Sequence, residues 1–191
     1  MSQTSPSWHL AQVNIARARA RLDSPLMAGF VAQLERINAV ADASPGFVWR
    51  LQTDTGNALA IRMSDGDPRM LVNLSTWESL QALTAYVYRS AHSEPMRRRS
   101  EWFERLKVPT VALWWVPAGH RPAAREGEHR LEQVATHGPS PAAFTFARPF
   151  PHPGTVARPV ARSPRETDHH TVHRVHRAHG PQKPGAHEES R

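Results

Sequence analysis

The chain has 191 residues, 39% of them hydrophobic, which fits one domain with a sizeable core and a short appendage. The absence of cysteine excludes disulfides, thiolate metal sites and a cysteine nucleophile. A net charge of +7 is too small to demand nucleic acid as a partner, and no apolar run approaches the roughly 20 residues of a membrane span. We therefore expect a cytoplasmic protein with no signal peptide and no membrane contact.

The N-terminal part of the chain predicts a strand followed by a helix. Residues 8–15 alternate roughly between apolar and polar side chains, which is typical of a strand. Ser24 and Pro25 then provide an N-cap and a first helical residue. Apolar side chains recur at three- and four-residue steps as far as Ala41, so we expect an amphipathic helix of roughly 18 residues.

The middle of the chain predicts three strands and a helix. Residues 47–52 form an apolar strand pattern, and the turn signal after them predicts a hairpin extension at 58–63. Residues 70–74 predict the next strand. Ser75 and Glu78 have the spacing of a capping box, so we expect a helix with Ser75 as its N-cap and Glu78 at N3.

The last part of the body predicts a helix, a buried strand and a further helix. Ser93 is the expected N-cap of the first helix, with a proline just inside it. Residues 110–116 are almost entirely apolar, which indicates a strand buried on both faces. A helix is expected from about 122 to 136, and residues 144–146 predict a short edge segment.

The order of these elements reduces to β-α-β-β-α-β, the pattern of ferredoxin-like α+β folds. Such a sheet carries its helices on one face. Large apolar groups nevertheless point to both sides of the strands, as Val48 does opposite Trp49. A second sheet from another copy is the simplest cover for the helix-free face, so we expect a homodimer that forms a dimeric α/β barrel.

The composition changes after residue 151, where Leu, Ile, Phe, Tyr and Trp no longer occur. Such a segment cannot bury enough apolar surface to offset the entropy of ordering it. We expect a flexible N-terminus at 1–6, a barrel domain at 7–151 and a disordered tail at 152–191. The tail has histidines at spacings that suit a metal, namely His169, His170, His173, His176 and His179. Weak attraction to RNA or phospholipid and a non-functional extension are the other interpretations.

Several sequence segments resemble a bacterial family of unknown function in the dimeric α/β-barrel superfamily, which contains the antibiotic-biosynthesis monooxygenases. The segment VNLSTWES at 72–79, with the helix after it and then His92, resembles the superfamily. The segments that resemble the family are WHLAQVN at 8–14, GFVWRL at 46–51, YRSAH at 88–92, EWF at 101–103 and LWWVP at 113–117. The resemblance covers residues 7 to about 151. It implies the fold and the homodimer, and it implies no established activity.

Three residues are candidates for catalysis. The superfamily's cofactor-independent monooxygenases use an Asn and a Trp in a pocket between sheet and helices, and the Asn73-x-x-x-Trp77 spacing is similar to that pair. His92 follows a predicted helix, whose C-terminal end favours imidazolium, and could be a general base or an iron ligand. The alternatives are structural: Asn73 satisfies backbone groups, Trp77 packs the helix start, and His92 has no chemical role.

Five further residues are candidates for binding a substrate. Asn14 shares a strand face with Gln12, so its amide could point into a pocket. Arg50 is a charge within a strand and must be paired or lie at an edge. If three tryptophans line one cavity they would suit a flat aromatic ligand, and otherwise they belong to the core or a dimer interface. These are Trp49, Trp102 and Trp114.

The run Arg97 to Arg99 fans around a predicted helix, so it cannot form one flat patch. It is either a solvated face, or Arg98 or Arg99 neutralises an anionic ligand.

Three functions remain open. The first is a protein that binds a small aromatic molecule and acts as a monooxygenase with no cofactor and no metal. The second is a haem or metal binder that uses His92, and the third is a non-catalytic assembly module with a basic tail. The sequence contains no P-loop, Rossmann glycine pattern, HExxH or GxSxG, which removes most support for nucleotide-dependent and serine-hydrolase chemistry.

Overall fold

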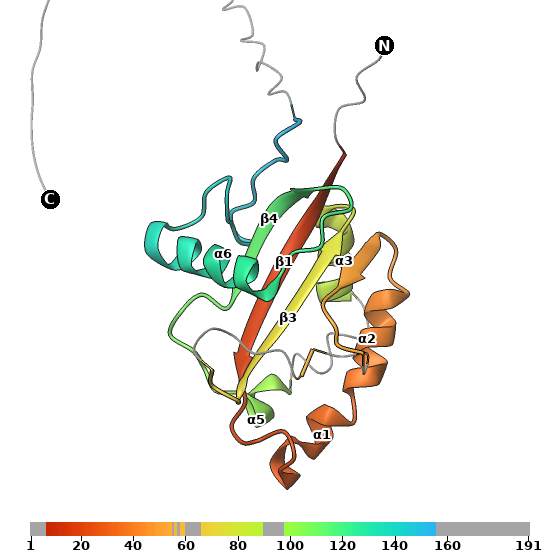
Figure 1. Ribbon diagram of the computed structural model, residues 1–191, viewed down its shortest axis with the longest axis vertical. Coiled ribbons are helices and arrows are strands. Elements are labelled where there is room, and N and C mark those ends of the chain that lie inside the picture. Colours follow the sequence, from red (N-terminus) through yellow and green to blue (C-terminus); the bar gives the residue numbers. More distant parts are fainter. Residues whose placement is uncertain (1–6, 55, 57, 60–65, 90–97, 156–191) are drawn as a thin grey trace, which may run out of the picture. The chain divides into compact units, whose positions relative to one another are not determined.

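The computed structural model describes residues 7–54, 56, 58–59, 66–89 and 98–155. Four strands form one antiparallel sheet in the order β2-β3-β1-β4 (Figure 1). The strands are β1 (Trp8–Arg17), β2 (Phe47–Arg50), β3 (Met70–Trp77) and β4 (Val111–Pro117). The helices are η1 (Pro25–Met27), α1 (Ala28–Val31), α2 (Leu34–Asp42), α3 (Leu80–Arg89), α5 (Arg99–Trp102) and α6 (Ala124–His137). This order and topology confirm the ferredoxin-like α+β fold.

The strand register divides the side chains of the sheet between two faces. On β1, even-numbered residues such as Asn14 point to one face, which we call the pocket face, and odd-numbered residues such as Val13 point to the other, the α6 face. On β3 and β4 the odd-numbered residues, such as Asn73 and Leu113, lie on the pocket face because directly paired residues share a face.

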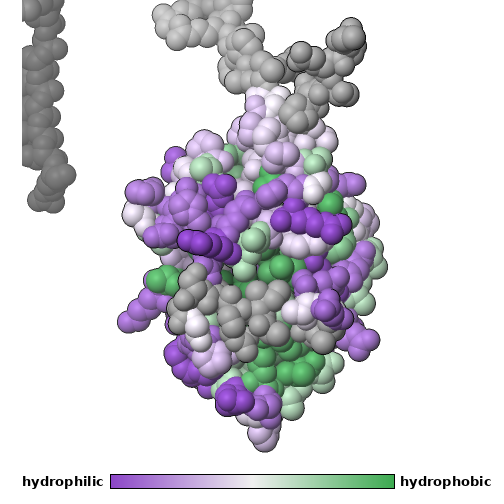
Figure 2. Space-filling model, viewed as in Figure 1, coloured by the Kyte–Doolittle hydropathy of each residue, from purple (hydrophilic) through white to green (hydrophobic). Residues whose placement is uncertain are grey.

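Helix α6 lies against the α6 face, on the opposite side of the sheet from α3 (Figure 1). Its residues Leu131 and Val134 are buried in one cluster with Val13 and Trp114 of the sheet. A Cβ atom at Gly127 would lie 2.9 Å from Cγ2 of Val13, so this glycine allows α6 to approach β1 closely. The outward surface of α6 is hydrophilic (Figure 2).

The predicted reason for a dimer is therefore wrong, because one chain already covers the second face of its sheet. At most 1% of each central side chain on the α6 face is exposed; these residues are Ala11, Val13, Leu74, Ala112 and Trp114. The sequence predicted α6 itself at 122–136 but did not place it against the sheet. The homodimer and its barrel remain predictions.

The first predicted helix is interrupted, although its stripe of apolar residues is in place. The backbone N–H of Gln33 bonds to the carbonyl of Phe30, three residues back, while its side-chain Nε2 donates to the carbonyl of Gly29 at 2.8 Å. That carbonyl would accept the Gln33 backbone N–H in a continuous α-helix. The side chain of Ser24 does not cap the first turn.

The predicted capping box is wrong. Ser75 and Trp77 belong to β3, where Trp77 pairs with both Leu10 and Phe47, so strand pairing extends past the expected end. The cap is Ser79, whose Oγ accepts the backbone N–H of Ala82 at 3.1 Å. The predicted hairpin extension at 58–63 falls mostly outside the described residues, and 58–59 are not in a strand.

The predicted edge segment at 144–146 is confirmed at Phe144, whose backbone exchanges two hydrogen bonds of 2.8 Å with Leu113. The chain after it remains packed on the domain. Trp115 donates its indole N–H to the carbonyl of Phe150 at 2.8 Å, and its ring contacts that of His152 edge-on. Within the described ranges, no helix has the length and apolar character needed to span a membrane.

Candidate functional site

A cavity of about 160 Å³ lies between the pocket face of the sheet and the helices α1, α2 and α5. Most of its lining is apolar, as is usual for small-molecule sites. The polar side chains that line it are Asn14, Asn38, Arg50, Asn73 and Arg99. Four of the eight predicted site residues therefore meet at one place: Asn14, Asn73, Arg50 and Trp102.

The floor of the pocket is a pair of asparagines. Asn14 on β1 lies directly opposite Asn73 on β3, and residues paired in this way have Cβ atoms about 5 Å apart. The amide nitrogen of Asn14 donates to the carbonyl of Thr110 at 3.2 Å, which fixes that side chain. Among the described residues none bonds to the side-chain amide of Asn73, which is exposed to the cavity side of the sheet. Asn73 can therefore both donate and accept a hydrogen bond.

Three aromatic rings line the pocket. Phe30 of α1 contacts Phe103 edge-on, with ring centroids 4.9 Å apart, and its centroid lies 6.0 Å from that of Trp102. Only 4% of Trp102 is exposed, and a Cβ atom at Gly29 would lie 3.6 Å from its ring. These contacts hold the rings in one arrangement, which suits a flat ligand.

Arg50 shows why a charge is tolerated in strand β2. A bulge between Phe47 and Trp49 turns Arg50 to the pocket face, opposite Ser75. Its guanidinium binds both carboxylate oxygens of Asp42, at 2.8 and 3.2 Å, and donates to the carbonyl of Gly56 at 2.8 Å. The charge is thus paired, as expected from the sequence. These hydrogen bonds join α2 and the loop after β2 to the sheet.

An ion-pair network supports the end of the pocket where β1 stops. Arg17 binds Asp67 and Glu104, both at 2.8 Å, and Arg69 binds Glu104 at 3.2 Å. The network joins the end of β1, the start of β3 and the segment after α5. The hydrogen bond from Arg17, together with that from the backbone of Arg69, lowers the pKa of Asp67 below its usual value.

Trp77 does not line the pocket. Only 1% of it is exposed, its ring stacks on that of Tyr86, and Phe47 contacts it edge-on. Its indole N–H donates to the Oγ of Ser75 at 2.9 Å, and Ser75 donates to Gln12 at 3.0 Å. This chain of hydrogen bonds gives Trp77 a place in the core beneath α3.

The other predicted site residues lie elsewhere. Trp49 and Trp114 belong to the cluster on the α6 face, so the structure does not bring Trp49, Trp102 and Trp114 to one cavity. The indole N–H of Trp114 donates to Glu126 of α6 at 2.8 Å. His92 and the tail histidines are outside the described residues. The described part of the chain contains no cluster of three side chains that could bind a metal.

The region of the first predicted helix contributes four pocket residues that were missed as site residues: Phe30, Leu34, Ile37 and Asn38. The sequence assigned the apolar stripe of this helix to the core, whereas part of it faces the cavity. Asn38 follows Ile37 directly and was the available signal, because a polar residue beside the stripe of a core-facing helix needs a partner.

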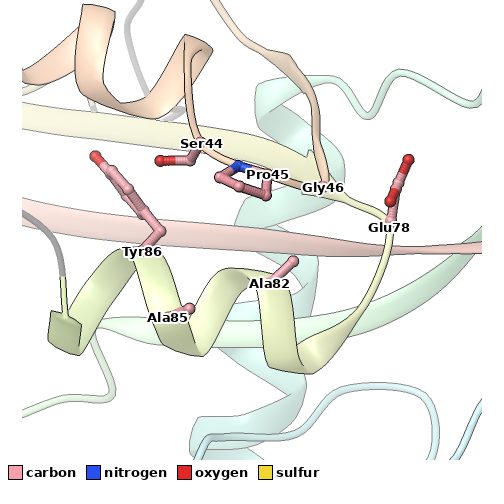
Figure 3. A pocket seen from close by; sticks show the side chains of 7 residues that line it. All are labelled: Ser44, Pro45, Gly46, Glu78, Ala82, Ala85 and Tyr86. Atoms are coloured by element: carbon pink, nitrogen blue, oxygen red, sulfur yellow. The ribbon is translucent and has the colours of Figure 1, made fainter.

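A second hollow, of about 460 Å³, lies on the outer surface between the turn 44–46 and α3 (Figure 3). Small residues such as Ala82 and Ala85 line it, and Glu78 and Tyr86 lie at its two ends (Figure 3). Burial, reinforced by the charge of Asp42, raises the pKa of Tyr86 to about 12. Its two polar ends do not converge, so we assign no chemistry to it.

The fold and the pocket define a ferredoxin-like domain with a largely apolar cavity beneath its helices. The model of the family "Domain of unknown function (DUF3291)" matches residues 9–160, and the chain belongs to this family. The family resemblance predicted from the sequence is therefore confirmed. Among curated proteins, none matches the chain.

Solved structures with a similar arrangement are distant in sequence. A protein of unknown function from Nitrosomonas europaea, NE2512, is 14% identical over 63% of this chain and 100% of its own, with a TM-score of 0.40. SnoaB, a cofactor-independent oxygenase from Streptomyces nogalater, is 16% identical over 61% of this chain and 96% of its own, with a TM-score of 0.39. Similarity at this level carries no information about the site of this chain.

Proposed function

We propose that this protein binds a small aromatic molecule in the cavity beneath α1, α2 and α5. The observation that carries the proposal is the Asn14–Asn73 pair, which places two amides on rigid neighbouring strands at the floor of an apolar cavity. A cavity with aromatic walls and a few convergent polar groups is the usual form of a small-molecule site. The third function, an assembly module without a ligand, is less well supported, because the described side chains leave a cavity on this part of the pocket face.

The size of the cavity favours a ligand with one ring in the enclosed part. Its volume is about 160 Å³. An engineered apolar cavity of about 150 Å³ accepts benzene in another protein.

Cofactor-independent oxygenation is the reaction that we propose for this site. In such a reaction an activated methylene carbon of the substrate is oxidised to a carbonyl while O₂ supplies the new oxygen and leaves its second atom as water. The substrate must first lose a proton to form an enolate. The Nδ2 groups of Asn14 and Asn73 would donate hydrogen bonds to the enolate oxygen and stabilise that charge, in the manner of an oxyanion hole.

The base for this step is not among the described lining residues, which include no histidine, aspartate or glutamate. His92 is the proposed base, by its position in the chain after α3. The alternative in which His92 binds haem rests on the same residue, and no described contact favours it.

Native mass spectrometry of protein purified from its own host, followed by oxygen uptake with an anthrone, tests the proposal. We expect a retained molecule of low mass, and oxygen uptake that is at least tenfold slower in Asn73→Ala. Oxygen uptake that is unchanged in both Asn73→Ala and His92→Ala would exclude oxygenation as the reaction of this site. A Soret band in the purified protein would favour haem binding. The proposal of ligand binding itself is contradicted if the purified protein retains no small molecule and also binds no added aromatic probe.

A further inference from the structure

We propose that the ligand is an aromatic acid whose anionic group is recognised by Arg99. This inference rests on the proposed binding function and names the chemical class of the ligand. It comes from the distribution of charge around the pocket, which is uneven.

The described lining residues contain two arginines and no acidic side chain. The positive charge of Arg50 is already balanced, because Asp42 holds its guanidinium through two hydrogen bonds. The charge of Arg99 is not balanced in this way: among the described residues no carboxylate lies within ion-pair distance of it. The described lining of the pocket therefore has a net positive charge on its α5 side.

The neighbouring carboxylates are committed to other arginines. Glu101 binds Arg98 through both of its oxygens, at 2.9 and 2.8 Å. Glu104 binds Arg17 and Arg69. Arg98 also lies over the ring of Trp102, 5.1 Å from its centroid, so α5 directs one arginine to a protein carboxylate and leaves Arg99 beside the cavity.

The guanidinium and the asparagine amides of the pocket would bind different parts of a ligand. A guanidinium only donates hydrogen bonds and binds a carboxylate through two parallel ones. An asparagine amide both donates and accepts, so the floor accommodates a hydroxyl or a carbonyl. A ring between the aromatic side chains would thus direct its acidic group to Arg99 and its neutral polar substituent to Asn14 and Asn73.

Benzoate and benzamide test this inference, because they have nearly the same shape and differ in charge. Their dissociation constants are measured by titration calorimetry at low ionic strength with the full-length chain. We expect the unmodified protein to bind benzoate at least about fivefold more tightly than benzamide, since a charged hydrogen bond at an exposed site is weakened by solvent. In Arg99→Gln the two constants should become equal while that for benzamide is unchanged, which also shows that the variant is folded.

Arg105→Gln is the matched control, because Arg105 is an exposed arginine six residues along the chain that does not line the pocket. It should keep the preference for benzoate. Equal binding of both probes by the unmodified protein, or a preference that persists in Arg99→Gln, would overturn the anionic class and leave the binding function in place. A failure of both probes to bind would overturn the proposed function, and this inference with it.

Discussion

Asn14 of β1 and Asn73 of β3 lie directly opposite each other in an antiparallel register, with both side chains directed to one cavity. Asn14 is fixed by its hydrogen bond to the Thr110 carbonyl, whereas no described residue forms a hydrogen bond with the side-chain amide of Asn73. Because both residues are on strands in the middle of a four-stranded sheet, their spacing is set by backbone pairing. A polar pair held in this way is preorganised for ligand binding.

Asn73→Ala should weaken the binding of an aromatic ligand while leaving the stability of the protein nearly unchanged. We expect at least about fivefold weaker binding, since a neutral hydrogen bond contributes about 1 kcal/mol. The free energy of unfolding should change by no more than about 0.5 kcal/mol, because the removed amide is exposed. Urea unfolding and ligand titration measure the two quantities, and a large loss of stability with intact binding would contradict the assignment.

Trp77→Phe should have the opposite effect. Trp77 is buried and donates to Ser75, so the variant loses a buried hydrogen bond and some packing. We expect a loss of about 1–3 kcal/mol in the free energy of unfolding. Ligand affinity should be unchanged, because Trp77 does not line the cavity. If Trp77→Phe abolished binding without destabilising the protein, the catalytic role suggested by the Asn73–Trp77 spacing would regain its support.

Gly46→Ala should destabilise the protein through two separate effects. Gly46 has a φ of 77°, and an added Cβ would lie 2.6 Å from the Cβ of Ala82. The left-handed conformation costs an alanine about 1–2 kcal/mol, and the overlap with α3 adds to this. Gly119→Ala is the control, because Gly119 has a φ of 87° but no atom within 4 Å of the added Cβ. Thermal unfolding should show a larger loss for Gly46→Ala, and equal losses would mean that α3 does not approach the turn this closely.

Gly127→Ala tests the contact between α6 and the sheet. Alanine favours a helix by about 1 kcal/mol over glycine, so an unconstrained helix would be stabilised. Here the new methyl would lie 2.9 Å from Val13, and overpacking of this kind costs about 1–3 kcal/mol. We expect a net loss of stability that the second substitution Val13→Ala partly relieves, measured as a coupling in a double-mutant cycle. A stabilising Gly127→Ala would place α6 away from β1.

The ion pairs of Asp67 should make stability fall in acid. Because Arg17 holds the pKa of Asp67 below its ordinary value of 3.8, the stability from this interaction is fully present above that value. It is lost as the pH falls through the lower pKa of the folded state. Asp67→Asn should therefore lower the melting temperature at pH 6, and the difference from the unmodified protein should shrink toward pH 2. The exposed Asp54→Asn is the control, and a difference that is independent of pH would contradict the ion-pair explanation.

The sequence predicted the strands well because their apolar alternation and the buried run at 110–116 are local patterns. It misplaced the start of α3, because the pairing of Trp77 with Leu10 and Phe47 extends β3 and outweighs a local capping motif. It predicted α6 but not the face that α6 covers. On that face Gly127 permits a close approach to Val13, a long-range contact that the local sequence pattern does not reveal.

Within the site, Asn14 and Arg50 were predicted as polar residues at strand positions, and Trp102 as one of three tryptophans that could line a cavity. Asn73 was predicted from the spacing to Trp77, which is similar to the Asn and Trp pair of the superfamily's monooxygenases. The prediction that Trp49 and Trp114 join them failed, because the bulge in β2 turns Trp49 to the α6 face and alternation along β4 places Trp114 there. Phe30 and Asn38 were missed, since a helical stripe that faces a cavity has the same periodicity as one that faces a packed core.

The side-chain amide signals of Asn14 and Asn73 in a ¹⁵N-resolved NMR spectrum test the binding site most directly. Titration with a soluble aromatic probe such as benzoate should shift both amide pairs along one saturating curve. The amide of Gln133, on α6 at the other face of the sheet, should not move. Saturable shifts at other residues with both asparagine signals unmoved would place binding elsewhere and contradict the account.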